Sequence, residues 1–237
     1  MHNIIHCMSD QDWEKANDRN VQDLFRFRLV AALALSTKSL YLDIGANRGD
    51  YIKVASNYCL AKNIHAFEPI SYMAEYLEET FPKANIYQAA VSDTNGYAQF
   101  NIANLDELSG LSMRNQNELP SGTTFTSVET KIVSIDACMK HIKNLDLVKI
   151  DVEGAEINVL IGMRKTISKL RPIIFVEHGI HGPEHFGYGP NDFWEIVESL
   201  NYRILTVDGQ EVSSCDVLVD SFFNWPIWNY LLVPNQR

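Results

Sequence analysis

The sequence predicts a doubly wound, mostly parallel Rossmann-like α/β sheet with helices on both faces. Short apolar runs are typical of buried strands, and they occur at residues 40–44, 64–67, 86–91, 147–150 and 173–176. Amphipathic segments at residues 72–81 and 156–170 lie between these runs and predict helices. Because strands that alternate with helices form parallel sheets buried on both faces, this order of elements indicates the fold class.

The two ends of the chain add further elements. Residues 1–36 predict a helical lead-in, for which residues 9–12 are the capping signal. Its buried face is predicted to come from Trp13, Leu24, Phe25 and residues 29–35. After the fifth strand, the sequence predicts a helix at residues 192–200 and strands at residues 202–207 and 229–233. The last strand is expected to be antiparallel.

Residues 96–133 depart from the alternation of strands and helices. The segments 96–100 and 126–133 have the composition of strands, and the polar loop between them contains Gly110, Pro120 and Gly122. We expect an insertion or a lid beside the main sheet.

Composition limits the class of protein. A chain of 237 residues with 46% hydrophobic content suits one domain, with residues 1–36 as the lead-in and residues 37–237 as the α/β core. The net charge of −10 disfavours nucleic acid as a partner. Four scattered cysteines without a CxxC pair predict neither a disulfide framework nor a structural metal, and they suit a reducing cytoplasm. The apolar run at residues 29–35 is too short to span a membrane.

A glycine-containing loop follows the first predicted strand. The segment Asp43-Ile-Gly45-Ala-Asn47-Arg-Gly49 connects this strand to a helix, and its glycines allow the backbone to approach a ligand at the carboxyl edge of the sheet. The alternative is that Gly45 and Gly49 only form a tight turn that packs the helix against the strand. A second feature is therefore needed to indicate a cofactor.

That second feature is an acid at the end of the next strand. Glu68 stands 25 residues after Asp43, where a carboxylate can accept hydrogen bonds from both hydroxyls of a ribose. The pair indicates an adenosine-type cofactor. A nicotinamide enzyme is disfavoured because the loop lacks the GxGxxG pattern, and Asp43 favours a ligand that bears an amino group.

Five motifs then resemble the FkbM family of methyltransferases. They are Leu42-Asp-Ile-Gly-Ala-Asn47, Ala66-Phe-Glu-Pro69, Ala89-Ala-Val-Ser-Asp93, Val148-Lys-Ile-Asp-Val-Glu-Gly-Ala-Glu156 and Asn229-Tyr-Leu-Leu-Val-Pro234. Together they cover residues 38–234 in the family's order. The resemblance implies a class I methyltransferase fold and S-adenosyl-L-methionine (SAM) as cofactor.

The resemblance also implies a set of cofactor-binding residues. Asp43 and the loop residues Gly45, Ala46, Asn47 and Gly49 would hold the methionine part of the cofactor. Glu68, with Pro69 beside it, would hold the ribose, and the segment around Ser92 and Asp93 would hold the adenine. Asp93 can alternatively be a turn acid, because residues 92–96 are rich in side chains that bond their own backbone.

The reaction centre is predicted at the end of the fourth strand. Asp151, Glu153 and Glu156 meet the start of a helix there, close to where the methyl group should lie. Asp151 and Glu153 can orient the cofactor's amino group, hold a substrate hydroxyl or bind a divalent cation, whereas Glu156 is favoured as a helix-end acid. We predict Asp151 and Glu153 as catalytic residues, and Asp151 also as a cofactor contact.

Methyl transfer needs an in-line nucleophile and at most one base. Glu177 and His178 follow the fifth strand at the same edge of the sheet, and we predict His178 as the base, with His181 and His185 lining the adjoining loop. The alternatives are ordinary loop residues or a metal site formed by these four side chains. Residues 109–112 predict either a small-residue turn near the substrate, as in the FkbM family, or a linker.

These observations together predict an enzyme that methylates a hydroxyl of a sugar, glycan or other small metabolite, the acceptor class that the resemblance implies. One alternative is a methyltransferase in which a divalent metal lowers the pKa of the acceptor hydroxyl. Another is a regulatory or scaffold protein that binds SAM without catalysis, because fold alone does not fix function.

Overall fold

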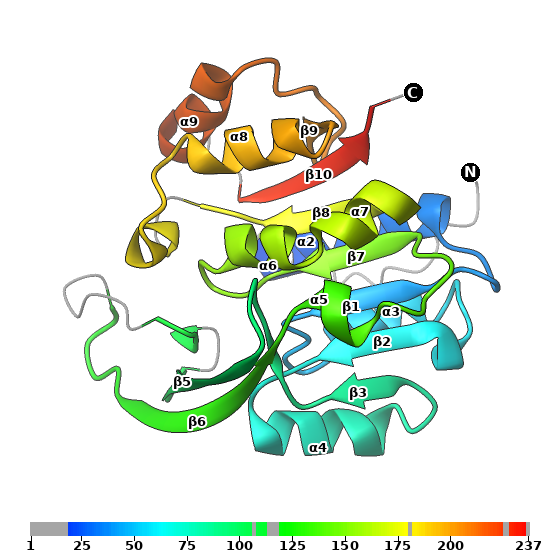
Figure 1. The fold of residues 1–237 in the computed structure, drawn as a ribbon, viewed down its shortest axis with the longest axis vertical. Helices are drawn as coiled ribbons and strands as arrows, with labels where there is room; N and C mark the ends of the chain where they lie inside the picture. Colours follow the sequence, from blue (N-terminus) through cyan, green and yellow to red (C-terminus); the bar gives the residue numbers. More distant parts are fainter. Residues whose placement is uncertain (1–18, 106–107, 113–118, 180–181, 225–227, 236–237) are drawn as a thin grey trace, which may run out of the picture.

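The computed structural model describes residues 19–105, 108–112, 119–179, 182–224 and 228–235. Its main sheet has seven strands in the order β3-β2-β1-β7-β8-β10-β9 (Figure 1). The strand bounds are β1 Tyr41–Ile44, β2 Ile64–Phe67, β3 Asn85–Tyr87, β7 Leu147–Ile150, β8 Ile173–Glu177, β9 Tyr202–Thr206 and β10 Asn229–Pro234. The five strands from β3 to β8 are parallel to their neighbours, and β10 is antiparallel to both β8 and β9. The predicted fold class, including the antiparallel last strand, is confirmed.

Helices cover both faces of this sheet (Figure 1). Their bounds are α2 Arg19–Ala34, α3 Asp50–Ala55, α4 Ser71–Thr80, α5 Ile135–Cys138, α6 Glu156–Gly162, α7 Arg164–Leu170, α8 Asp192–Ser199 and α9 Cys215–Asn224. Short 3₁₀ helices lie at Ala61–Asn63 and Pro183–Phe186. Among the described helices, none is both long and apolar enough to cross a bilayer.

Alternation along the strands divides the core between the two faces. Leu42 and Val176 belong to the core beneath α6, α7 and α8. Tyr41 and Phe175 belong to the core beneath α2 and α3. The ring of Phe27 on α2 packs edge-on against Phe175, with ring centroids 5.3 Å apart. Every side chain at the carboxyl edge of the sheet therefore points toward one of these two faces.

The inserted segment supplies two strands of a second, three-stranded sheet in the order β4-β6-β5. β4 is Ala90–Val91, β5 is Gly96–Ala103 and β6 is Phe125–Val133. β5 and β6 pair antiparallel along their whole length, from Gly96 opposite Ile132 to Ala103 opposite Phe125. Figure 1 shows this pair as a long arm beside the main sheet, as the sequence predicts for an insertion.

Several elements differ from the sequence predictions, among them helix α5, which was not predicted. The expected strand at residues 86–91 is two strands in different sheets, because the chain turns after Tyr87, whose carbonyl accepts the Ala89 N–H. The expected helix at residues 156–170 is broken at Met163, whose φ of −120° and ψ of 14° are not helical. Helix α9 was not predicted.

The described part of the lead-in forms helix α2, but its buried face is shifted from the predicted one. Phe27, Val30 and Ala31 are buried, whereas Phe25 is 40% exposed and Leu33 is 89% exposed. The expected capping signal at residues 9–12 and Trp13 lie outside the described residues. The division of the chain into a lead-in and a single-domain core stays a prediction.

Candidate active site

Two adjoining cavities lie at the carboxyl ends of β1, β2, β7 and β8. The first cavity, of about 120 Å³, is lined by Gly45, Glu68 and Asp151 together with apolar side chains. The second cavity, of about 500 Å³, is lined by Asp23, Asp151 and Glu177, among others. Asn47 and Asp151 line both, so the two cavities meet at these residues.

The glycine loop forms the floor where the cavities meet. Gly45, Asn47 and Gly49 all have positive φ, of 79°, 47° and 80°. The Gly45 and Ala46 amides donate to the Phe67 carbonyl at 3.0 and 3.1 Å, so the loop is tied to the end of β2. A Cβ on Gly45 would lie 1.8 Å from the Asp151 carbonyl oxygen, so only glycine fits between β1 and β7 at this point.

Glu68 is placed by two backbone amides. Its Oε2 accepts the Asn47 N–H at 2.8 Å and its Oε1 accepts the Ile70 N–H at 2.9 Å. The side chain is only 4% exposed, and burial raises the pKa of its carboxyl to about 7, opposed by these two hydrogen bonds. A carboxylate oxygen has more than one lone pair, so each oxygen can still accept a bond from a ligand in the first cavity.

The remaining wall of the first cavity is largely apolar. It comes from the end of β2, from α4, from the turn into β4 and from the arm, through Phe67, Pro69, Ile70, Met73, Ala89, Ala90, Val91, Phe100, Ser109 and Leu111. Such a wall beside one buried carboxylate suits a flat apolar ring joined to a group with two hydroxyls. The predicted small-residue turn thus contributes Ser109 to a cavity. Glu153, at φ 56°, and Ala155 line the same cavity.

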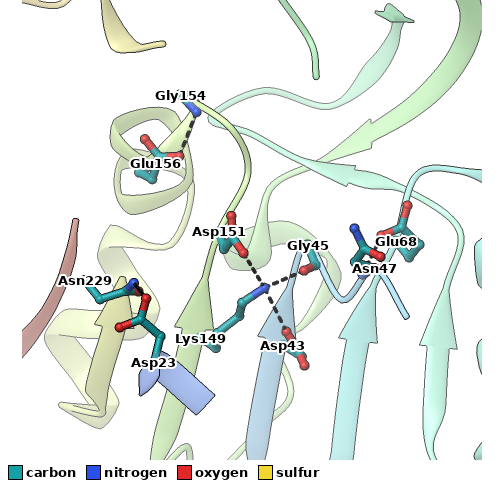
Figure 2. Close-up of polar contacts among 10 residues, drawn as sticks. All are labelled: Asp23, Asp43, Gly45, Asn47, Glu68, Lys149, Asp151, Gly154, Glu156 and Asn229. Carbon is teal, nitrogen blue, oxygen red and sulfur yellow. Dashed lines mark hydrogen bonds and ion pairs between the residues drawn. The ribbon is translucent and has the colours of Figure 1, made fainter. Parts of the chain in front are cut away.

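Lys149 connects the loop to the end of β7, as Figure 2 shows. Its Nζ donates to the Gly45 carbonyl at 2.5 Å and lies 3.2 Å from Asp151 Oδ2 and 3.6 Å from Asp43 Oδ1. The side chain is 2% exposed, and the two carboxylates outweigh its burial, so that the pKa of Lys149 is raised. Its charge therefore holds Gly45 and Asp151 in place.

Asp43 lies away from both cavities. Its side chain is 0% exposed, and burial raises the pKa of its carboxyl to about 6, although Lys149 opposes this shift. It lines neither cavity, because Lys149 and the glycine loop lie between. The predicted direct contact of Asp43 with the methionine part of a cofactor therefore has no support from its position.

Glu177 lies at the end of β8, in the second cavity. Burial raises the pKa of its carboxyl to about 8, and the neighbouring charge of Asp151 adds to this shift while Lys149 opposes it. A carboxyl with this pKa is partly protonated and partly ionised near neutral pH, as a general base requires.

His178, the next residue, points into the opposite core. Its ring stacks on Phe193, with centroids 3.9 Å apart, and its Nδ1 lies 3.4 Å from Glu156 Oε2. The side chain is 2% exposed and lines neither cavity. Glu156 accepts the Gly154 N–H at 2.8 Å, so this acid braces the loop before its own helix.

The other predicted site residues divide between the cavities and the surroundings. Ala46 lines the second cavity, and Gly49 ends the loop at the start of α3. Ser92 and Asp93 bond each other at 3.0 Å and line neither cavity, whereas Ala89 to Val91 line the first. His181 lies outside the described residues.

The described residues contain no group of three or more His, Cys, Asp or Glu side chains that could hold a metal ion. The structure thus offers no support for the metal-dependent alternative in the part of the chain that it describes.

Sequence reasoning missed several contributors to the second cavity, among them two residues of α2, and it gave Lys149 no role. Asp23 and Leu24 come from α2, far from the motifs in sequence, and no local pattern marks them. Lys149 stands inside one of the motifs, and its place between two acids in sequence was the available signal.

Comparison with known proteins identifies a family whose sequences resemble this chain. A family model described as Methyltransferase FkbM domain matches residues 43–204. A curated relative, the 2-O-methyltransferase NoeI of Sinorhizobium fredii, is 27% identical over 165 residues, which are 64% of this chain and 68% of that protein.

Solved structures with a similar fold are more distant. A methyltransferase FkbM from Methylobacillus flagellatus aligns with a TM-score of 0.48 and 12% identity, over 97% of this chain and 56% of that one. This chain thus spans little more than half of that protein's length. A TehB-like SAM-dependent methyltransferase from Corynebacterium glutamicum aligns with a TM-score of 0.47 and 12% identity, over 95% of both chains.

The family match begins at Asp43, on the strand that leads into the glycine loop, and ends within β9. It includes Glu68, Lys149, Asp151 and Glu177. The chain belongs to the FkbM methyltransferase domain family.

Proposed function

We propose that this protein is a SAM-dependent methyltransferase that methylates a hydroxyl of a sugar, a glycan or another small metabolite. The observation that carries the proposal is the pair of cavities that meet at Asn47 and Asp151 on the carboxyl edge of the sheet. In this proposal the first cavity would hold the nucleoside, and the second would leave room for an acceptor. Family membership supports methyl transfer as the reaction.

The residues of the first cavity fit the nucleoside part of SAM. Glu68 would accept hydrogen bonds from the two ribose hydroxyls, and Pro69 packs beside it. Ile70, Met73 and Phe100 provide an apolar wall for the base. For the adenine, we favour Ala89 to Val91 over the predicted Ser92 and Asp93, because only the former line this cavity.

When bound, SAM supplies a methyl group on a cationic sulfur. Glu177 would accept the proton of the acceptor hydroxyl. The oxygen of that hydroxyl would bond to the methyl carbon while the carbon–sulfur bond breaks and its electron pair stays on the sulfur. We propose Glu177 rather than His178 as the base, because Glu177 lines the second cavity and His178 lies in the opposite core.

For Asp151 and Glu153 we propose the roles that the sequence predicts, as residues of the reaction centre. Asp151 stands where the cavities meet, oriented by Lys149 at 3.2 Å, and would position the reacting groups. Glu153 lines the first cavity with a left-handed backbone, a conformation that is found at functional sites more often than elsewhere. The buried carboxylates around the second cavity would favour binding of a positively charged cofactor.

The proposed acceptor class and location rest on two further observations. The similarity to the S. fredii protein, a 2-O-methyltransferase, supports a hydroxyl acceptor. The three described cysteines, Cys59, Cys138 and Cys215, are free thiols, which suits the reducing cytoplasm that we propose as the location.

The test is a methyl-transfer assay with radiolabelled SAM. The acceptors would be hexoses, deoxyhexoses, N-acetylhexosamines and short glycans, each measured with and without EDTA. We expect label in at least one acceptor, as an O-methyl group by NMR, with or without the chelator. Binding of SAM with transfer to none would favour the regulatory alternative. Transfer that EDTA abolishes and Mg²⁺ restores would favour the metal-dependent one.

A further inference from the structure

The lead-in helix α2 forms part of the wall of the second cavity. Asp23 and Leu24 line this cavity, although α2 lies before the first residue of the family match. The helix is anchored by Phe27, whose ring is 0% exposed and packs edge-on against Tyr51 and Phe175. The position of Asp23 is therefore fixed by the core.

Hydrogen bonds also hold the carboxylate of Asp23. Its Oδ2 accepts from Asn229 Nδ2 on β10 at 3.0 Å, a contact that Figure 2 shows, and its Oδ1 accepts from Arg26 at 3.1 Å. Arg26 also lies 3.4 Å from Asp208. Asp23 is 7% exposed, so a buried, oriented carboxylate borders the cavity.

The amino-acid part of SAM carries an ammonium group, which needs a carboxylate partner where it binds. The sequence assigns Asp43 to this part of the cofactor. However, Asp43 is 0% exposed behind Lys149, and Asp151 pairs at 3.2 Å with the buried Lys149 ammonium, whereas Arg26, which pairs with Asp23 at 3.1 Å, has a side chain that is 31% exposed. Glu177 is taken by its proposed role as base. Asp23 is the remaining buried acid on this wall.

We infer that Asp23 binds the α-ammonium group of the amino-acid part of SAM and of its product S-adenosylhomocysteine (SAH). This inference rests on the proposed function, and it makes α2 a cofactor-binding element. A charge-assisted hydrogen bond from an ammonium to a carboxylate in such a cavity is worth about a tenfold difference in affinity or more.

The test is a thermodynamic cycle by calorimetry. The ligands are SAH and its desamino analogue, which differ only in the α-amino group, and the proteins are the wild type, Asp23→Asn, Asp23→Glu and Leu33→Ala. Asparagine keeps one of the two acceptor oxygens, so it can keep the contact with Asn229 or the one with Arg26, and Asp23→Glu, which keeps both oxygens, controls for the docking of α2. Leu33, on the same helix, is 89% exposed and serves as the control.

We expect the wild type and Leu33→Ala to prefer SAH by about tenfold, and Asp23→Asn to bind both ligands alike. Asp23→Glu keeps the charge and should keep part of the preference. Equal binding of both ligands by the wild type, or an undiminished preference in Asp23→Asn, would overturn the inference while the proposed function stands. If the wild type binds neither ligand, the proposed function itself fails.

Discussion

Adjacent residues of a strand point to opposite faces of the sheet, and this alternation decides which side chain reaches the site. Phe175 and Glu177 face α2 and the second cavity, whereas Val176 and His178 face the core beneath α8. The sequence places both Glu177 and His178 at the carboxyl edge of the sheet, but only the face toward which each side chain points distinguishes them. Glu68 was predictable because its distance from the glycine loop reflects the βαβ unit itself.

The protonation state of Glu177 gives a test at the residue scale. Its pKa is raised to about 8, mainly by burial, and a base acts in its deprotonated form. The kcat/KM for the acceptor should therefore rise with pH to a plateau, with a midpoint at about 8 or below, because the positive charge of the cofactor favours the ionised form of Glu177. Glu177→Gln should lose this limb and about 10²-fold in kcat/KM.

His178→Gln is the comparison variant. It should be less stable, because it loses the stacking on Phe193, but its pH profile should keep the wild-type shape. A profile that is flattened by His178→Gln and unchanged by Glu177→Gln would restore His178 as the base.

At the scale of elements, buried strands were easier to predict from the sequence than the positions where the chain changes sheet or a helix breaks. β2 and β7 have the predicted bounds, because their apolar runs are buried on both faces. The change of sheet after Tyr87 has no mark in its local sequence, whereas the break at Met163 directly follows Gly162, a residue type that weakens helices. The buried face of α2 differs from the predicted one because apolar residues occur on all sides of this helix, so the sequence alone does not indicate which side is buried.

The glycine loop gives a test at this scale. Gly45→Ala places a Cβ 1.8 Å from the Asp151 carbonyl at a φ of 79°, so it should destabilise the protein by about 3 kcal/mol or more and weaken SAH binding. Gly209→Ala is the matched control, because Gly209 has a φ of 87° and open space around it. It should cost about 1 kcal/mol, the backbone strain alone. If urea unfolding showed similar losses of stability for both variants, the close approach of Gly45 to the Asp151 carbonyl would be contradicted.

At the scale of the whole molecule, buried acids should make the ligand-free protein less stable at high pH. The pKa values of Asp43, Glu68 and Glu177 are raised to about 6, 7 and 8, chiefly by burial. Between the unfolded pKa near 4 and these values, the folded state binds more protons, so stability falls as pH rises. The slope is at most about 1.4 kcal/mol per pH unit for each group.

Urea unfolding from pH 5 to pH 8.5 checks this dependence. Glu68→Gln should reduce the loss of stability between pH 5 and pH 7, because its side chain does not titrate. Stability that rises across this range in the ligand-free protein would contradict the burial of these acids.

The central claim is that the carboxyl edge of the sheet binds the nucleoside of SAM, and calorimetric titration with SAH and NAD tests it most directly. The proteins are the wild type, Glu68→Gln and Glu75→Gln, whose site on α4 is exposed. We predict that the wild type and Glu75→Gln bind SAH and not NAD, and that Glu68→Gln loses about tenfold or more in affinity. Failure of the wild type to bind SAH, or binding of NAD in its place, would contradict the claim.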